Sequence, residues 1–85
     1  MSYAVQFTPR AHRDFAALDR NVQRRLTPHI NRLAENPFPP GYKRLHADEP
    51  FFRLRVGDYR MIYQVEGKRL TVIIVKVGHR RDVYR

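Results

Sequence analysis

Three arginines lie close together in the last third of the chain: Arg53, Arg55 and Arg60. The first two alternate with apolar residues, and the third follows a Gly57-Asp58 turn. Arginine keeps its proton in proteins, and its planar fork matches the oxygens of phosphate. Three arginines on one small surface, in a chain with few carboxylates, therefore predict a phosphate-rich partner.

A basic, aromatic segment further along the chain contains five more side chains that suit contact with such a partner: His79, Arg80, Arg81, Tyr84 and Arg85. His79 ends an apolar segment, and the pKa of imidazole suits proton transfer near neutral pH. The ring of Tyr84 could stack on an unpaired base, as aromatic rings do in proteins that bind single strands. Tyr42 and Phe51 could add stacking surface.

The chain lacks the residues that several other common kinds of active site need. Two-metal sites need clustered carboxylates, and here Asp48-Glu49 has no evident third ligand. The chain has no cysteine, no phosphate-binding glycine loop and no Ser-His-Asp order. We therefore expect catalysis without a metal or a cofactor.

Length and charge narrow the class of protein. The 85 residues suit one domain, residues 1–85, with one modest core. A net charge of +9 makes nucleic acid the leading class of partner. The first residues lack the apolar run of a signal peptide, and the longest apolar run, residues 72–75, is too short to span a bilayer. We expect a cytoplasmic protein without membrane contacts.

Apolar periodicity predicts the elements that position these side chains. Residues 3–7 alternate as a strand does, and Thr8-Pro9 is typical of a helix start. Asn21 is the expected cap of a second helix, which Pro28 should kink or loosen without ending. Residues 36–41 form a proline-rich loop. The two helices present apolar stripes, consisting of Ala11, Phe15 and Leu18 and of Val22, Leu26, Ile30 and Leu33.

The second half of the chain reads as a meander of three strands, at residues 51–56, 59–65 and 70–77. Tight turns at Gly57-Asp58 and at residues 66–68 join them. The predicted fold class is α+β: an N-terminal strand and a two-helix hairpin packed on one face of a mostly antiparallel sheet.

Strand alternation assigns each side chain to one face of the sheet. A two-residue loop at the first turn sets Arg55 opposite Arg60 and Arg53 opposite Ile62. The three arginines then share one face, here called the arginine face. We expect the helices to cover the other face, with Phe52, Leu54, Val56, Tyr59, Met61, Tyr63, Val65, Leu70, Val72 and Ile74. The same alternation assigns to the arginine face Ile73, Val75, Val77 and His79.

Directly opposed like charges are unfavourable on a sheet, and a bound anion would relieve that cost. A plainer explanation is that the arginines only keep an exposed face soluble. Asp58, Glu66 and Asp82 could pair with some of them.

With these features, the chain resembles the RelE/ParE superfamily of toxin–antitoxin toxins, specifically its RelE branch. The resemblance rests on Arg53-Leu54-Arg55, on residues 57–63 and on residues 77–84. The order of strand, two helices and meander extends it over essentially the whole chain. A basic pair followed by a tyrosine is similar to RelE-type ribonucleases, whereas ParE-type gyrase poisons generally lack that tyrosine.

The resemblance implies a RelE-like fold and an endonuclease that cuts mRNA in the ribosomal A site. The RNA 2′-hydroxyl would attack the adjacent phosphorus without a metal. Arg80 would stabilise the transition state or the leaving oxygen, and Tyr84 would stack on a codon base. The residues expected to hold the scissile phosphate are Arg53, Arg55 and Arg60. Further RNA contacts are expected from Lys43, Arg44, Arg81 and Arg85.

The resemblance also implies a cognate acidic antitoxin, and contact with DNA only through the antitoxin complex. Many relatives carry lysine at the positions of Arg53 and Arg55, and arginine cannot serve as a base. The general base is therefore either His79 or no residue at all, with catalysis by charge and positioning. Two other functions stay open: a gyrase inhibitor of the ParE kind, and a catalytically silent module that acts with its antitoxin on DNA.

Overall fold

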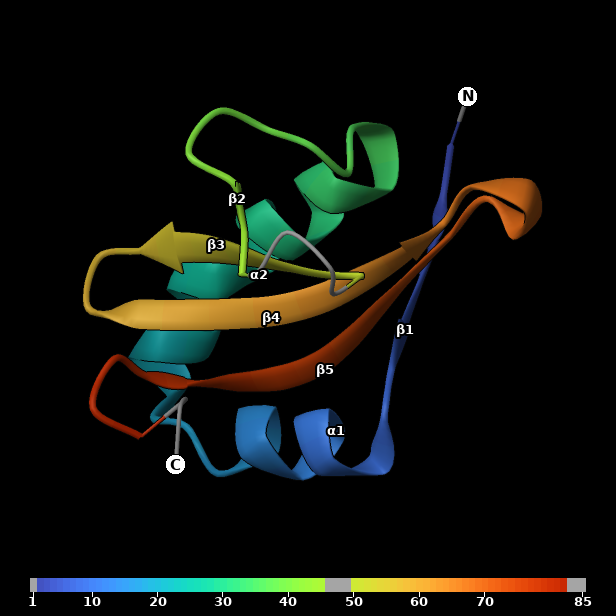
Figure 1. Cartoon of the computed structure of the whole chain (residues 1–85). Helices are drawn as coiled ribbons and strands as arrows, with labels where there is room; N and C mark the ends of the chain where they lie inside the picture. Colours follow the sequence, from blue (N-terminus) through green and yellow to red (C-terminus); the bar gives the residue numbers. More distant parts are fainter. Residues whose placement is uncertain (1, 46–49, 83–85) are drawn as a thin grey trace.

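A five-stranded sheet with two helices against one face forms the framework of the molecule (Figure 1). The computed structural model describes residues 2–45 and 50–82. The strand order is β1-β5-β4-β3-β2; β1 pairs with β5 in parallel and the other pairs are antiparallel. The elements are β1 (Ala4–Phe7), α1 (Pro9–Ala16), α2 (Arg20–Glu35), β2 (Lys43–Arg44), β3 (Phe51–Val56), β4 (Tyr59–Glu66), a 3-10 turn η1 (Gly67–Arg69) and β5 (Thr71–His79).

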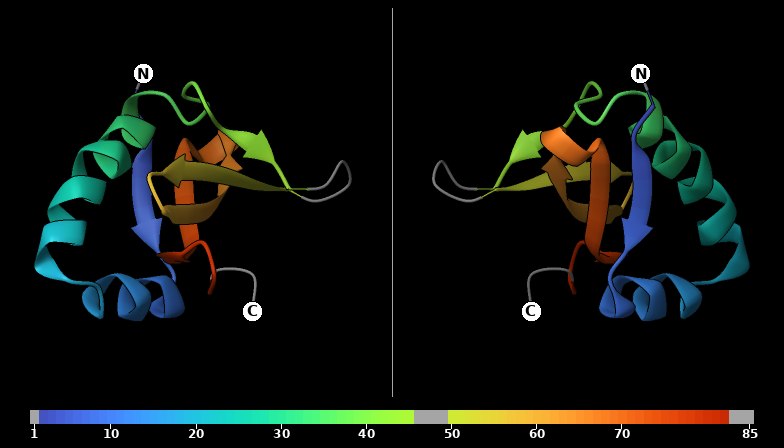
Figure 2. Two further views of the ribbon diagram at one scale, coloured as in Figure 1. Left: turned by 90° about the vertical axis from the view of Figure 1, so that its left-hand side faces the viewer. Right: turned by 90° about the vertical axis from the view of Figure 1, so that its right-hand side faces the viewer.

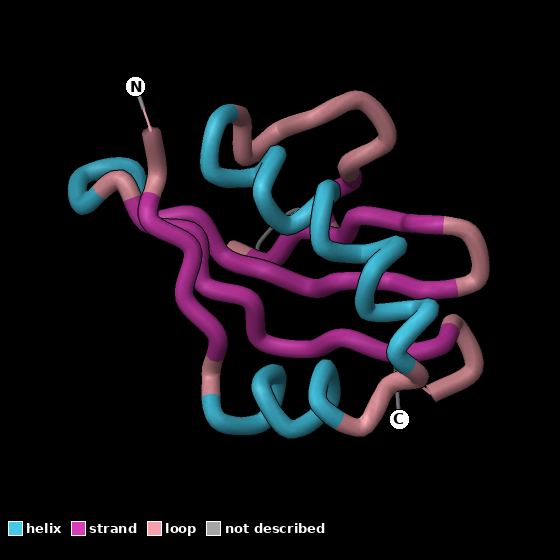
Figure 3. Tube along the Cα trace, turned by 180° about the vertical axis from the view of Figure 1, so that it is seen from behind, coloured by secondary structure: helices cyan, strands magenta, loops and turns pink. Residues whose placement is uncertain are grey.

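Both helices lie on the same side of the sheet, which leaves the other face open (Figure 2). Seen from behind, α2 crosses over the strands and α1 runs beside β5 (Figure 3). The core between these layers contains Leu26, Leu33, Met61, Tyr63, Val72 and Ile74. The predicted α+β architecture is confirmed.

The start of the first helix is as predicted, and the start of the second is not. The Thr8 hydroxyl accepts a hydrogen bond from the Ala11 N–H (3.1 Å). The second helix begins at Arg20 rather than after Asn21, with Asp19 at the cap position. The Asp19 carbonyl accepts from the Gln23 N–H (3.0 Å), so the backbone has already turned two residues before the predicted cap.

Helix α2 continues through Pro28 to Glu35. Proline lacks the N–H that would bond to the carbonyl four residues earlier. The helix persists because Leu26, Ile30 and Leu33 on its inner face are all buried, and tertiary burial of an apolar stripe outweighs one lost hydrogen bond.

The hairpin of β3 and β4 has the predicted register. Arg55 lies opposite Arg60 and Arg53 lies opposite Ile62. Gly57 has φ +59°, a left-handed conformation that suits glycine at this turn. The three arginines therefore share one face, as predicted.

The pairing of β4 with β5 contains a β-bulge that the sequence did not reveal. Ile62 lies opposite Lys76 and Tyr63 lies opposite Ile74, so Val75 is the extra residue. One extra residue reverses the alternation of everything that follows. Val77, assigned above to the arginine face, is instead buried in the helix-side core.

The turn before β5 also differs from the prediction. Leu70 was expected on the helix face of the strand, but it lies outside β5 with φ 48°. Its N–H donates to the Gly67 carbonyl and closes the 3-10 turn. The strand thus begins one residue later, at Thr71.

Tyr63 fixes the loop after α2 to the core. Its side chain is fully buried, and its hydroxyl donates to the Pro37 carbonyl at 2.7 Å. Burial raises the pKa of Tyr63 well above the ordinary value for tyrosine, and nearby Tyr42 raises it further. The folded state therefore strongly prefers the neutral phenol.

We expect Tyr63→Phe to lower the free energy of unfolding by about 1–3 kcal/mol, because the Pro37 carbonyl would lose its donor. The wild type should also lose stability as pH rises above about 10, where the unfolded tyrosine ionises and the folded one does not. Urea titrations of both proteins at pH 8 and pH 10.5 test this. Equal alkaline losses in the two proteins would contradict it.

Candidate functional site

The arginine face carries cations from four neighbouring strands. Arg55 is exposed, whereas Arg53 and Arg60 are half-buried. Lys43 of β2 lies opposite Arg53, so the edge strand contributes to the same face. Lys76 of β5 joins them because the bulge places it opposite Ile62. Sequence reasoning missed Lys76, since unbroken alternation would have sent it to the other side.

Arg60 is the central cation of this face. Its Nε and Nη1 atoms are buried and have no hydrogen-bond partner within the described part of the chain. Burying a charged donor without a partner is costly, and the Arg55 charge directly opposite adds repulsion. An anion with several oxygens would relieve both costs, and phosphate fits this requirement.

The turn between β3 and β4 brings Arg80 to the same end of the sheet. The Arg80 N–H donates to the Asp58 carbonyl at 2.8 Å, and the Arg55 Nε donates to the Gly57 carbonyl at 3.2 Å. Figure 1 shows this turn and the segment after β5 side by side. Arg55, Arg60 and the exposed Arg80 thus gather around one corner of the sheet.

His79 does not lie on the arginine face, which corrects its predicted location. It pairs with Tyr59, and the two rings meet edge to face at 5.5 Å between centroids. Tyr59 packs against the helix-side core, so His79 lies on that side too. Its Nδ1 accepts a hydrogen bond from the N–H of the exposed Arg81 (3.2 Å). The reversal of alternation at the bulge is the cause.

Side chains at the start of α1 and within it form hydrogen bonds to β5 at the bulge and just after it. The Asp14 carboxylate accepts from the Val77 N–H at 3.4 Å, and the Thr8 hydroxyl donates to the Val75 carbonyl at 3.4 Å. Strand β1 pairs only with the first part of β5, Thr71 to Ile74, so these side chains bond the strand edge beyond it. They help to fix the strand that leads to Arg80.

Carboxylates of the described residues form no ion pairs with the cations at this corner of the sheet. Among residues 2–45 and 50–82, no ion pair involves Arg55, Arg60 or Arg80. Glu66, a possible partner in the sequence, pairs with Arg69 (3.9 Å) instead. No three His, Cys, Asp or Glu side chains of the described ranges gather where they could hold a metal ion.

The arginine face also has an apolar part. Beside the cations lies a hollow of about 400 Å³, lined by Arg10, Leu45, Phe51, Ile62, Gln64, Val75 and Lys76. Phe51 therefore lies on this face. Tyr42, expected with it as stacking surface, packs elsewhere, against Phe38 and Phe52.

Of the other predicted residues, some lie outside the described part of the chain and one lies away from the arginine face. Arg44 lies over the Phe52 ring, 5.4 Å from its centroid, and is exposed. Tyr84, Arg85 and the Asp48-Glu49 pair lie outside the described residues. Within the described ranges, neither helix has the length and apolar character needed to cross a membrane.

Comparison with known proteins gives consistent relatives. Residues 5–84 match the family model described as the ParE toxin of the type II toxin–antitoxin system, parDE. Toxin RelG of Mycobacterium tuberculosis is 31% identical over 86 residues, covering 100% of this chain and 99% of that toxin. The mRNA interferase toxin RelE of Escherichia coli is 28% identical over 87 residues, covering 99% and 92%.

Solved structures show the same fold. A chain of the toxin–antitoxin complex RelBE2 from Mycobacterium tuberculosis has a TM-score of 0.83 at 28% identity, over 93% of this chain and 99% of that one. A chain of the archaeal RelE–RelB complex from Pyrococcus horikoshii has a TM-score of 0.82 at 26% identity, over 96% and 99%. The family match and the shared fold together establish that this chain belongs to the ParE toxin family of type II toxin–antitoxin systems, within the RelE/ParE superfamily.

Proposed function

We propose that this toxin is an endoribonuclease that cuts mRNA on the ribosome without a metal ion. The observation that carries the proposal is the half-buried Arg60, whose Nε and Nη1 have no partner among the described residues. Arg55 lies directly opposite it, and Arg80 approaches the same corner. The relative in Escherichia coli that is named an mRNA interferase supports this reading.

The RNA supplies its own nucleophile in this mechanism. The 2′-oxygen forms a bond to the adjacent phosphorus and the bond to the 5′-oxygen breaks, leaving a 2′,3′-cyclic phosphate and a 5′-hydroxyl. Negative charge builds up on the pentavalent phosphorus in between. Fixed guanidinium groups aimed at that charge stabilise the transition state more than the ground state. Arg53, Arg55 and Arg60 hold the phosphate, and Arg80 stabilises the leaving oxygen.

Charge and positioning, rather than a dedicated base, supply the catalysis. Arginine cannot accept a proton, and His79 lies on the opposite side of the sheet from Arg60. The proton of the 2′-hydroxyl therefore leaves to solvent, and solvent supplies the proton that turns the departing 5′-oxygen into a hydroxyl. The ribosome aligns the attacking oxygen, the phosphorus and the leaving oxygen, which removes much of the entropic barrier.

Further positive side chains extend the proposed contact with RNA. Lys43, Arg44, Arg81 and Arg85 bind phosphates away from the reacting one. Such contacts strengthen binding without reading sequence, and they weaken as salt is raised. We place the toxin in the cytoplasm because its substrate is ribosome-bound mRNA. We also propose that residues 1–85 form a single domain.

The mechanism is tested with a ribosome-bound mRNA that carries one 2′-deoxynucleotide at the mapped cleavage position. We expect cleavage at that position to stop, since the nucleophile is missing, and the unmodified mRNA to yield a 2′,3′-cyclic phosphate end. Cleavage of the deoxy substrate, or a product with a 3′-hydroxyl end, would contradict the proposed chemistry.

A cognate acidic antitoxin is the second partner that we propose. A domain of net charge +9 suits a negatively charged chain that folds as it binds. We expect co-expression with the small acidic protein encoded beside the toxin to restore growth, and the two proteins to copurify. Failure of both would remove the support for a toxin–antitoxin pair.

A gyrase inhibitor is the alternative function, and one observation favours it. The matching family model is described as a ParE toxin. A catalytically silent module acting with an antitoxin on DNA would need the same basic face. The gyrase inhibitor does not require the buried Nε and Nη1 of Arg60 to meet a phosphate.

A further inference from the structure

An exposed aromatic cluster lies at the edge of the sheet, where β2 pairs with β3. Phe38 and Tyr42 are each 40% exposed, and they are the exposed large hydrophobic residues of the described ranges. Their ring centroids are 5.3 Å apart. Phe52 packs against both, at 5.2 Å and 6.0 Å. The exposed part of each ring adds nothing to the core because it remains in contact with water, so that part is available to a ligand.

The loop that carries these rings is held in place from several sides. The Tyr63 hydroxyl bonds to the Pro37 carbonyl (2.7 Å) and the Tyr63 ring packs against Phe52. The Phe38 N–H donates to the Asn36 side chain (3.0 Å), and the Tyr42 N–H donates to the Pro39 carbonyl (3.1 Å). The rings are therefore preorganised, which lowers the entropic cost of binding a flat ligand.

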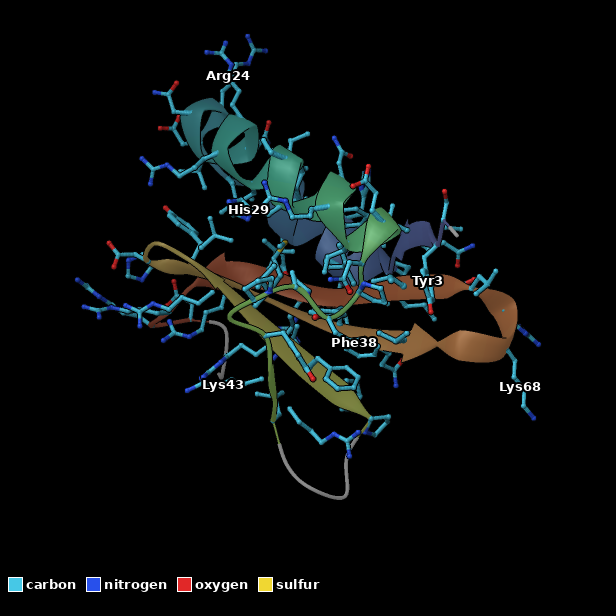
Figure 4. The ribbon with its side chains drawn as sticks, turned by 90° about the horizontal axis from the view of Figure 1, so that it is seen from above. Tyr3, Arg24, His29, Phe38, Lys43 and Lys68 are labelled. Carbon is cyan, nitrogen blue, oxygen red and sulfur yellow. The ribbon has the colours of Figure 1, made fainter. Side chains whose placement is uncertain are left out.

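Cations border the same surface. An open hollow of about 740 Å³ is lined by Phe38, Tyr42, Lys43, Arg44 and Phe52, and none of these described residues is a carboxylate. Figure 4 shows Phe38 and Lys43 near β2, while Lys68 projects from the far end of the sheet. Lys43 lies opposite Arg53 where β2 pairs with β3, so it links this hollow to the arginine face.

We propose that this cluster is a stacking platform for one unpaired base of a single-stranded RNA. Aromatic faces stack on bases, and neighbouring cations hold the attached phosphates. Lys43 lies between the platform and the arginine face, so one RNA strand can pass around the edge of the sheet. An acidic side chain would meet the two cations but would not use the flat aromatic faces, whereas a nucleotide uses both. The identity of the RNA as substrate rests on the proposed function, whereas base stacking at the platform does not require cleavage.

A short single-stranded RNA carrying the fluorescent base 2-aminopurine, with 2′-O-methyl groups to prevent cleavage, tests the proposal. We expect the wild type to quench the base on binding. Phe38→Leu and Tyr42→Leu should abolish the quenching and weaken binding about five- to hundredfold, the size of one stacking contact. Tyr42→Phe keeps the ring and should behave as wild type. Lys68→Ala is the control for loss of one charge, and circular dichroism verifies folding.

An abasic site in place of the probed base should weaken the wild type and leave the Tyr42→Leu variant unchanged. Equal weakening of both, or wild-type binding without quenching, would overturn the proposal. So would loss of antitoxin binding with unchanged RNA affinity, which would assign the cluster to the antitoxin. Quenching by a toxin that cuts no mRNA would uphold the platform and reject the proposed nuclease. Undiminished cleavage with no quenching would do the reverse.

Discussion

Replacing Arg60 with alanine is expected to lower the rate of mRNA cleavage on ribosomes about a hundredfold or more, the size seen when one preorganised donor to a transition state is removed. Toxicity in growing cells should disappear with it. The melting temperature should stay close to that of the wild type. The variant removes buried charge that lacks a partner in the described part of the chain and the repulsion with Arg55.

Matched variants separate the role of Arg60 from loss of charge in general. Arg60→Lys keeps the charge but loses the fork, so it should recover only part of the rate. Lys68→Ala removes one charge from the exposed 3-10 turn and should cut at the wild-type rate. A fully toxic Arg60→Ala variant, or an unfolded one, would reject a functional role for this face. An equally large loss of cleavage rate in His79→Gln would instead indicate that His79 acts as the general base.

The second large effect is expected at Tyr84. Changing it to alanine should slow cleavage by up to about a hundredfold, since stacking on one base is worth about 1–3 kcal/mol and a misaligned attack loses more. The melting temperature of the variant should stay close to that of the wild type. Single-turnover cleavage of ribosome-bound mRNA measures the effect.

Tyr84→Phe distinguishes two roles for the ring. It should keep most of the activity if the ring stacks, and lose it if the phenol transfers a proton. An alanine variant that cuts as fast as the wild type would show that Tyr84 has no part in the reaction. It would also remove the main sequence argument against a gyrase inhibitor.

Local signals predicted the hairpin that carries the arginines. Gly57-Asp58 fits only a tight turn, and alternation on both sides of it then fixes Arg55 opposite Arg60. In α2, Leu26, Ile30 and Leu33 recur at helical spacing on both sides of Pro28, so the sequence predicted that the helix continues past the proline. All three residues are buried in the structure. The fold class and the arginine face were therefore within reach of the sequence.

The bulge at Val75 was not predictable, because it leaves no residue signature in a strand that is apolar on both faces. Alternation counted through Thr71–His79 therefore failed after Val75. It misplaced Val77 and His79 and concealed Lys76. The aromatic cluster was only half visible: Tyr42 was noted, but its contact with Phe38 depends on how the proline-rich loop folds back onto Tyr63.

The most direct test of the account maps RNA ends on translating ribosomes after the toxin is added, beside a gyrase supercoiling assay with the same preparation. We predict new mRNA ends within A-site codons and no effect on supercoiling, with no cuts in the Arg60→Ala sample. Inhibited supercoiling with intact mRNA would contradict the account and identify a gyrase poison.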